Sequence, residues 1–99
     1  MLELKQYLHN FLDTQGRLIA FPARRKMKIY ALLYLAQTFE VEKSYSEQEI
    51  NEILLQRHTF SDPITLRRWL VDYRFLERSR DGSVYCMDEK QPTIEEIGL

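Results

Sequence analysis

Residues 62–87, DPITLRRWLVDYRFLERSRDGSVYCM, decide the fold. Asp62 followed by Pro63 is typical of a helix N-cap with proline in the first turn. Apolar side chains then recur at helical spacing within residues 63–75, and the predicted buried stripe is Leu66, Trp69, Leu70 and Tyr73. Asp81-Gly82 predicts a two-residue turn and therefore a β-hairpin over residues 76–87. A helix that runs directly into a hairpin is the outline of a winged helix-turn-helix.

The hairpin turn also predicts a register. Counting outward from Asp81-Gly82 pairs Arg80 with Ser83, Arg78 with Tyr85 and Leu76 with Met87. One face of the hairpin then changes from apolar at its base to basic at its tip. We favour a solubilising role for Arg78, stacked on Tyr85, and leave the role of Arg80 open.

The upstream residues supply the rest of such a domain. Ser46 and Glu49 form a capping box, so a helix should begin near Ser46. Residues 23–39 carry two apolar stripes and predict a longer helix that is buried on two sides, whereas residues 1–13 predict an amphipathic accessory helix. We therefore expect an α+β, mostly α, winged helix-turn-helix-like domain over residues 1–87, with an extra N-terminal helix, a C-terminal β-hairpin wing and an acidic tail over residues 88–99.

Composition limits the class of protein. The chain has 99 residues, of which 44% are hydrophobic, enough for one domain with its own core. One cysteine, Cys86, forms no intramolecular disulfide, and no secretory leader or apolar stretch of about 20 residues is present. These features predict a cytoplasmic protein without a membrane partner.

Charge is segregated along the chain although the net charge is only −1. Residues 17–30 contain five basic and no acidic residues, residues 40–52 contain five glutamates, and residues 57–80 contain six arginines. A dedicated non-specific DNA binder usually has a domain pI above about 9, against 6.1 for this chain. Any DNA binding should therefore come from local basic surfaces.

The basic residues of two segments are the candidate DNA contacts. The predicted nucleic-acid-binding residues are Arg24, Arg25, Lys26, Thr65, Arg67, Arg68 and Arg80. Arginine that contacts guanine from a helix in the major groove is the commonest specific pairing. The alternative for Arg67 and Arg68 is an ion pair with Asp62, Asp72 or a glutamate of the neighbouring helix, and the residues favour neither reading.

The chain also resembles the bacterial domain of unknown function 2087 family over nearly its whole length. The residues that carry the resemblance are Asp13, Gly16-Arg17-Leu18, Pro22 with Arg24-Arg25-Lys26, Tyr45-Ser46-Glu47 with Glu49-Ile50-Asn51, Asp62-Pro63, Thr65-Leu66-Arg67-Arg68, Leu70-Val71-Asp72 and Asp81-Gly82 with Tyr85. The resemblance implies a domain of transcriptional regulators that is sometimes attached to a separate DNA-binding domain. It implies no established biochemical activity.

This chain departs from the family pattern at two positions. Arg74 stands where the family commonly has glycine, so a left-handed backbone there would cost roughly 1 kcal/mol. Cys86 stands where a tryptophan is frequent.

No motif of a catalytic or cofactor site is present. The three glycines are isolated turn residues, and Asn51, His58 and Asp62 predict a hydrogen-bonded helix end more readily than a metal site. We therefore expect no enzyme activity, cofactor or metal.

The leading hypothesis is a winged-helix domain that binds double-stranded DNA through residues 63–75 and 76–87, as a homodimer or within a larger regulator complex. The rival is a non-catalytic protein-interaction or dimerisation module, whose apolar contact strip would be Ile64 and Val71, extended by Phe75 unless Phe75 ends the helix by folding back on its last turn.

Overall fold

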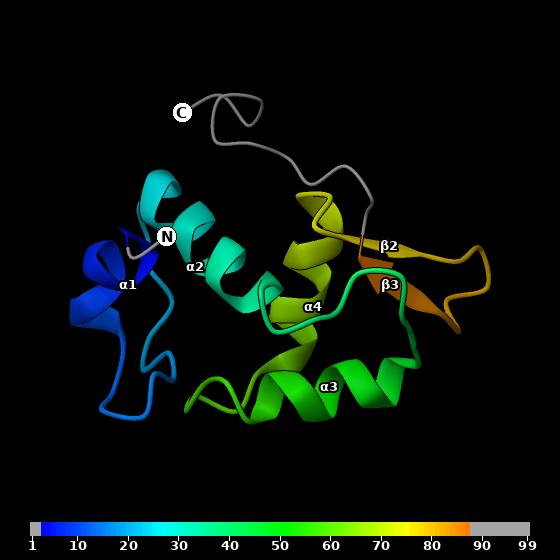
Figure 1. Ribbon diagram of the computed structural model, residues 1–99, viewed down its shortest axis with the longest axis horizontal. Coiled ribbons are helices and arrows are strands. Elements are labelled where there is room, and N and C mark those ends of the chain that lie inside the picture. Colours follow the sequence, from blue (N-terminus) through cyan, green and yellow to red (C-terminus); the bar gives the residue numbers. More distant parts are fainter. Residues whose placement is uncertain (1–2, 88–99) are drawn as a thin grey trace.

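The computed structural model describes residues 3–87, and the predicted acidic tail over residues 88–99 lies outside them (Figure 1). The described residues form helices and a small antiparallel sheet that lies at one end of the molecule (Figure 1). The elements in chain order are α1 (Glu3–Leu8), the 3-10 helix η1 (His9–Phe11), α2 (Arg25–Ala36), β1 (Ser44–Tyr45), α3 (Glu47–Leu55), α4 (Pro63–Asp72), β2 (Leu76–Arg78) and β3 (Tyr85–Met87). This is the expected α+β fold with a winged-helix-like arrangement.

Local sequence signals fix both ends of α4. The side chain of Asp62 accepts a hydrogen bond from the backbone N–H of Thr65, and Pro63 occupies the first turn. At the other end, the Phe75 N–H donates to the Leu70 carbonyl and the Arg74 N–H donates to the Val71 carbonyl. These two bonds form a Schellman motif, which places Arg74 in the left-handed region at φ 66°. The helix is therefore shorter than the predicted residues 63–75, and Phe75 is fully buried instead of joining an outer apolar strip.

The sheet has the predicted hairpin register and one strand that was not foreseen. Leu76 pairs with Met87 and Arg78 with Tyr85, as expected, while Ser44–Tyr45 adds a third strand on the other side of β3. The strands end at Arg78 and Tyr85, so the predicted pairing of Arg80 with Ser83 is wrong. The connection is a six-residue loop, because Ser79 rather than Arg80 begins the turn and its carbonyl accepts from the Gly82 N–H.

The helix before α4 begins as predicted. The Ser46 side chain accepts from the Glu49 N–H and the Glu49 carboxylate accepts from the Ser46 N–H, which completes the capping box. His58, beyond the end of α3, is buried and bonded at both ring nitrogens: Nδ1 lies against the Leu54 carbonyl, and Nε2 accepts from the Asp62 N–H. The predicted hydrogen-bonded helix end is therefore confirmed, and it connects α3 to the N-cap of α4.

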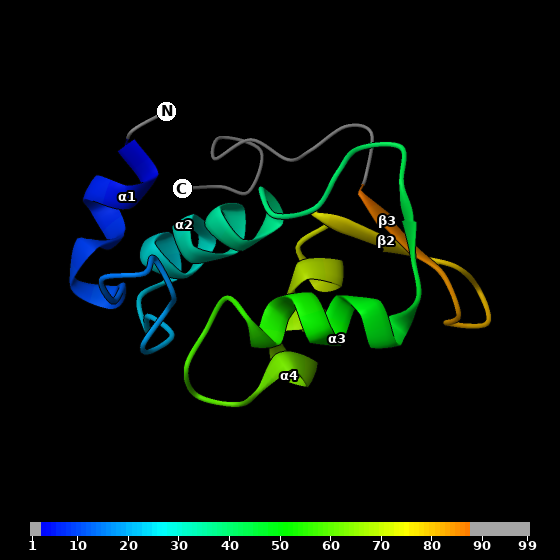
Figure 2. The same cartoon turned by 60° about the horizontal axis from the view of Figure 1, so that its bottom comes forward.

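The accessory helix packs against α2. Leu8 is fully buried, and the Tyr7 ring stacks on the Tyr30 ring with centroids 4.8 Å apart. The predicted helix over residues 1–13 thus appears as α1 followed by η1, and the predicted helix over residues 23–39 as α2. In the ribbon views α1 and the wing, which we define as residues 76–87, lie at opposite ends of the molecule with α4 between them (Figures 1 and 2).

The predicted inner stripe of α4 is only half buried. Leu66 and Leu70 are fully buried, whereas Trp69 and Tyr73 are partly exposed. Trp69 packs on Phe21, with ring centroids 4.5 Å apart, and Lys28 Nζ lies 4.5 Å from the tryptophan ring centroid. Trp69 therefore fills the junction between α4 and the start of α2, not the centre of the core.

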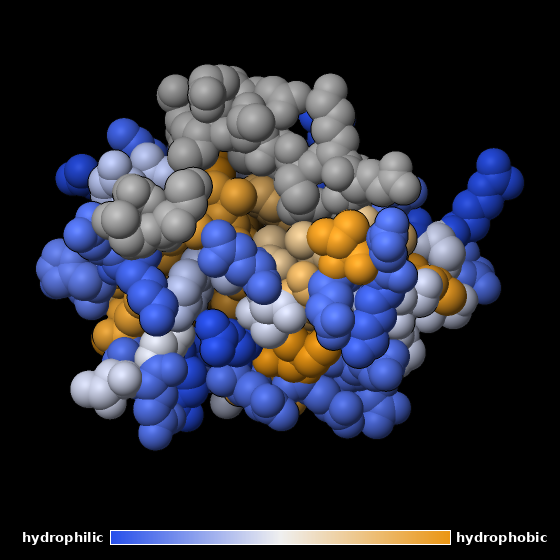
Figure 3. Space-filling model, viewed as in Figure 1, coloured by the Kyte–Doolittle hydropathy of each residue, from blue (hydrophilic) through white to orange (hydrophobic). Residues whose placement is uncertain are grey.

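Polar side chains dominate the face in Figure 3, and apolar side chains reach the surface there in patches. No helix within residues 3–87 is long and apolar enough to span a bilayer.

Candidate nucleic-acid interface

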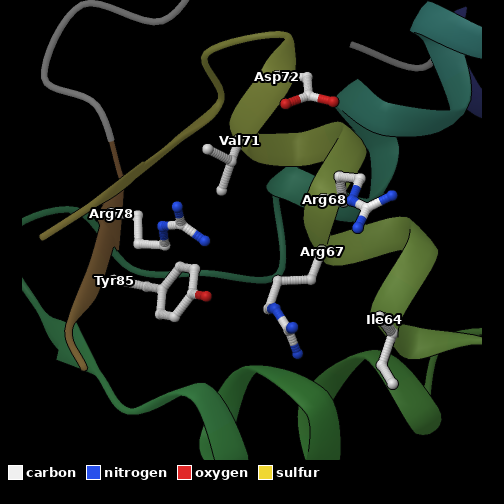
Figure 4. Close-up of a pocket in the computed structure, with 7 residues that line it drawn as sticks. All are labelled: Ile64, Arg67, Arg68, Val71, Asp72, Arg78 and Tyr85. Atoms are coloured by element: carbon white, nitrogen blue, oxygen red, sulfur yellow. The ribbon is translucent and has the colours of Figure 1, made fainter. Parts of the chain in front are cut away.

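A pocket of about 310 Å³ separates α4 from the wing (Figure 4). This α4–wing pocket is lined by Ile64, Arg67, Arg68, Val71, Asp72, Arg78 and Tyr85. Five of these residues come from α4 and two from the hairpin strands, so the pocket exists only because the wing folds back beside α4. In a helix-turn-helix protein this helix is the one that enters the major groove.

Arg67 contributes to the fold and not to an exposed face. Its guanidinium donates to Asn51 Oδ1 and lies 3.8 Å from Glu47 Oε1, and only 15% of its side chain is exposed. The Tyr85 hydroxyl donates to the same glutamate oxygen at 3.3 Å, and the Tyr85 ring centroid is 5.9 Å from the guanidinium carbon. We call Glu47, Asn51, Arg67 and Tyr85 the α3–α4 cluster. Of the two alternatives given for Arg67, the structure therefore shows the ion pair with a glutamate of the neighbouring helix.

Arg68 and Arg78 are exposed at the α4–wing pocket. In Figure 4, Arg67 points toward α3, Arg68 leaves α4 in another direction, and the Arg78 guanidinium lies over the pocket near Tyr85 and Val71. Arg78 reaches this position because it shares its face of β2 with the buried Leu76, two residues earlier. Asp72 is the acidic residue of this pocket.

A shallower pocket of about 400 Å³ continues along the edge of the wing. It is lined by Val71, Arg74, Leu76, Glu77, Arg78, Ser79 and Arg80, and thus shares Val71 and Arg78 with the α4–wing pocket. We define the arginine rim as Arg68, Arg74, Arg78 and Arg80. Among the side chains that the structure describes, none of these four guanidinium groups has an ion pair or hydrogen bond.

Two rim residues were not among the predicted contacts. The left-handed backbone of Arg74 directs its side chain to the pocket along the wing, and helical periodicity does not predict that backbone conformation. The signal that could have found Arg78 was already in the hairpin register, because the pairing with Tyr85 places Arg78 on the same side as α4.

The remaining predicted contacts lie elsewhere. Arg24, Arg25 and Lys26 are exposed at the start of α2, which lies across α4 from the wing (Figures 1 and 2). The Thr65 backbone N–H is used by the Asp62 cap, and the residue is partly buried. Arg68 thus lines the α4–wing pocket and Arg80 lines the adjoining pocket along the wing, whereas the basic start of α2 is a separate surface.

The wing loop is organised around one carboxylate. Asp81 Oδ1 accepts from the Ser83 hydroxyl at 2.7 Å, the Ser79 hydroxyl at 2.8 Å and the Ser83 N–H at 3.0 Å. The hydrogen bonds from Ser83, and then that from Ser79, lower the pKa of Asp81 from 3.8 to about 2. Asp81 is therefore a structural acid of the loop that presents Arg80.

Within residues 3–87 no group of three or more His, Cys, Asp or Glu side chains could hold a metal ion. The groups gathered at the α4–wing surface are guanidinium, carboxylate, hydroxyl and apolar groups, and the guanidinium groups could contact an anion.

Comparison with known proteins gives one match. The family model described as an uncharacterised protein conserved in bacteria (DUF2087) matches residues 17–87, which include α2, the sheet, α3 and α4. No curated protein and no solved structure matches the chain significantly. Because the family model covers most of the sequence and the whole α4–wing surface, this chain belongs to the bacterial DUF2087 family.

Proposed function

We propose that this domain binds the backbone of double-stranded DNA through α4 and the wing. The observation that carries the proposal is the arginine rim: four guanidinium groups around two adjoining pockets, none of which forms an ion pair or hydrogen bond with a described side chain. Phosphate contacts by arginine and lysine supply most of the sequence-independent affinity of DNA-binding proteins. The rim flanks the helix that such folds present to the major groove.

The acidic start of α3 is less of an obstacle than its sequence indicates. Glu49 is turned back into the capping box, and Glu47 accepts from Tyr85 and lies beside Arg67. Both carboxylates are thus engaged within the domain. Arg67 offsets part of the repulsion between Glu47 and a phosphate, whereas Glu49 is bonded to neutral donors and keeps its full charge at this helix end.

The same geometry predicts weak binding by a single domain. Asp72 and Glu77 lie among the rim arginines, and the net charge of the chain is −1. Useful affinity would therefore come from two copies on neighbouring half-sites or from a larger regulator. The exposed Arg24, Arg25 and Lys26 are a second basic surface from which such an assembly could extend its footprint.

One observation favours the rival interaction module. Ile64 is 58% exposed and lines the α4–wing pocket beside Val71, an apolar wall that DNA phosphates do not require. If this surface binds a protein partner, the substitution Ile64→Asp should abolish that protein complex. In that case the wild-type domain should not bind duplex DNA at any salt concentration.

The test is a salt series with a fluorescent random duplex and fluorescence anisotropy. Wild-type affinity should fall steeply as salt rises, and Arg68→Gln and Arg80→Gln should each lower the slope of log K against log salt by about 0.9. Lys43→Gln is the matched control, since it removes one exposed cation from the loop before β1 and should leave the slope unchanged. Absence of binding at low salt, or equal slopes in all four proteins, would contradict the proposal.

A further inference from the structure

A third pocket, of about 350 Å³, lies away from the arginine rim where four segments meet. The described residues that line it are polar or aromatic: Lys5 of α1, Gln15 of the following turn, Tyr34 of α2, Gln37 and Thr38 just after α2, and Arg57 after α3. We call it the amide pocket. In both ribbon views the segment between α1 and α2 passes between α1 and the end of α3 (Figures 1 and 2). Among the described residues, the lining carries two cations and no carboxylate.

Two buried polar atoms at this pocket have no hydrogen-bond partner among the described residues: Arg57 Nε and Thr38 Oγ1. A buried donor without a partner costs about 1–3 kcal/mol, so native proteins satisfy nearly all of them with protein, water or a bound ligand. The Arg57 guanidinium is held over the Tyr34 ring, with its carbon 5.5 Å from the ring centroid. It has no carboxylate partner among the described side chains.

The frame of the pocket is rigid. The Tyr34 hydroxyl donates to the Gly16 carbonyl at 2.8 Å, and the Arg57 carbonyl accepts from the Leu18 N–H at 2.9 Å. Gly16 has φ 79°, and a Cβ there would lie 2.9 Å from the Tyr34 hydroxyl oxygen. Glycine is therefore required by both backbone angle and space, and it fixes the ring on which Arg57 rests.

We propose that the amide pocket binds a small molecule through its oxyanion group, a carboxylate or a phosphate. Arginine recognises such groups by paired N–H donors, and lysine adds a point charge. The Gln15 and Gln37 amides and the Thr38 hydroxyl provide further donors around the same space. The volume falls within the range of small-molecule sites, about 300–1,000 Å³.

The site has a direct connection to α4. Arg57 is followed by His58, whose ring accepts from the Asp62 N–H at the α4 N-cap. An anion between Lys5 and Arg57 thus connects the accessory helix to the turn from which α4 starts. This inference uses none of the rim residues and stands independently of DNA binding.

The test is a titration of the ¹⁵N-labelled chain with inorganic phosphate and, separately, with succinate, both at constant ionic strength. We expect saturable NMR shifts at the Gln15, Gln37 and Thr38 amides and at Arg57 Nε with at least one anion. The anion that saturates identifies the headgroup. Loss of one charge-assisted hydrogen bond should weaken binding about tenfold or more, so Lys5→Gln and Arg57→Gln should both do so.

Lys26→Gln and Lys43→Gln are matched controls, because each removes one exposed cation outside the amide pocket and outside the arginine rim, and both should bind as the wild type does. If Arg57→Gln fails to fold, Lys5→Gln decides alone, since Lys5 is exposed on α1. The proposal is overturned if neither anion gives saturable shifts, if the controls weaken as much as the pocket variants, or if the shifts map to α4 and the wing.

Discussion

The α3–α4 cluster and the arginine rim use the same residue type for different purposes. In the cluster, Arg67 is mostly buried, donates to Asn51 and lies beside Glu47. Its charged group therefore stabilises the contact of α4 with α3 and with Tyr85 of β3. One residue further along α4, Arg68 is exposed at the α4–wing pocket and forms no ion pair with a side chain that the structure describes. Adjacent arginines in a basic motif therefore need not share a role. Burial and partners decide between structure and recognition.

Loss of Arg67 should produce the largest effect. Arg67→Ala leaves Asn51 and Glu47 without their cation and removes a buried side chain, so we expect a loss of about 1–3 kcal/mol in the free energy of unfolding. Urea denaturation measures it. Arg68→Ala is the matched comparison and should change stability by no more than about 0.5 kcal/mol. Equal losses for the two variants would abolish the distinction between cluster and rim.

Arg74→Gly should separate stability from recognition. Arg74 has φ 66° at the end of α4, where glycine avoids the Cβ penalty, so the variant should gain roughly 1 kcal/mol in the free energy of unfolding. It also removes one rim cation, so duplex affinity should fall although the fold is more stable. Thermal unfolding measures the stability of the variant, and fluorescence anisotropy on the same samples measures its duplex affinity. Arg74→Ala controls for the lost charge without the conformational gain, and a destabilised Arg74→Gly would contradict the assigned role of the Schellman motif.

The smallest effect concerns the wing loop. Because hydrogen bonds lower the pKa of Asp81 to about 2, its carboxylate stabilises the loop fully above pH 3.8, and this contribution is lost as pH falls through about 2. In NMR spectra the Ser83 amide should titrate with that low midpoint. Asp81→Asn should remove the titration while leaving the α4 amides unchanged. A midpoint near 3.8 would mean that Asp81 does not organise the loop that carries Arg80.

Local signals in the sequence were sufficient for most of the architecture. The Ser46 capping box, the Asp62 N-cap and the pairing of Arg78 with Tyr85 are confirmed, because each depends on residues close in sequence or on a turn that sets the register. The two-residue strand β1 has no pattern to detect, since its existence depends on pairing with β3, some 40 residues later. The shorter α4 follows from a left-handed Arg74, which helical periodicity does not encode.

The candidate sites were harder to predict from the sequence than the architecture was. Arg67 and Arg68 look alike in sequence, and only the approach of α3, with Glu47 and Asn51, distinguishes them. Lys5 and Arg57 are far apart in the chain and become neighbours through the packing of α1 and the contact of Leu18 with the end of α3. Tertiary packing therefore defines both surfaces.

The most direct test of the central claim, that α4 and the wing contact DNA, is an NMR footprint of a short duplex on the ¹⁵N-labelled chain at low salt. We expect shifts concentrated in residues 64–85, including the side-chain Nε signals of Arg68, Arg74, Arg78 and Arg80, with Arg67 Nε and the amide pocket unaffected. Shifts confined to other surfaces, or no shifts at any duplex concentration, would contradict it.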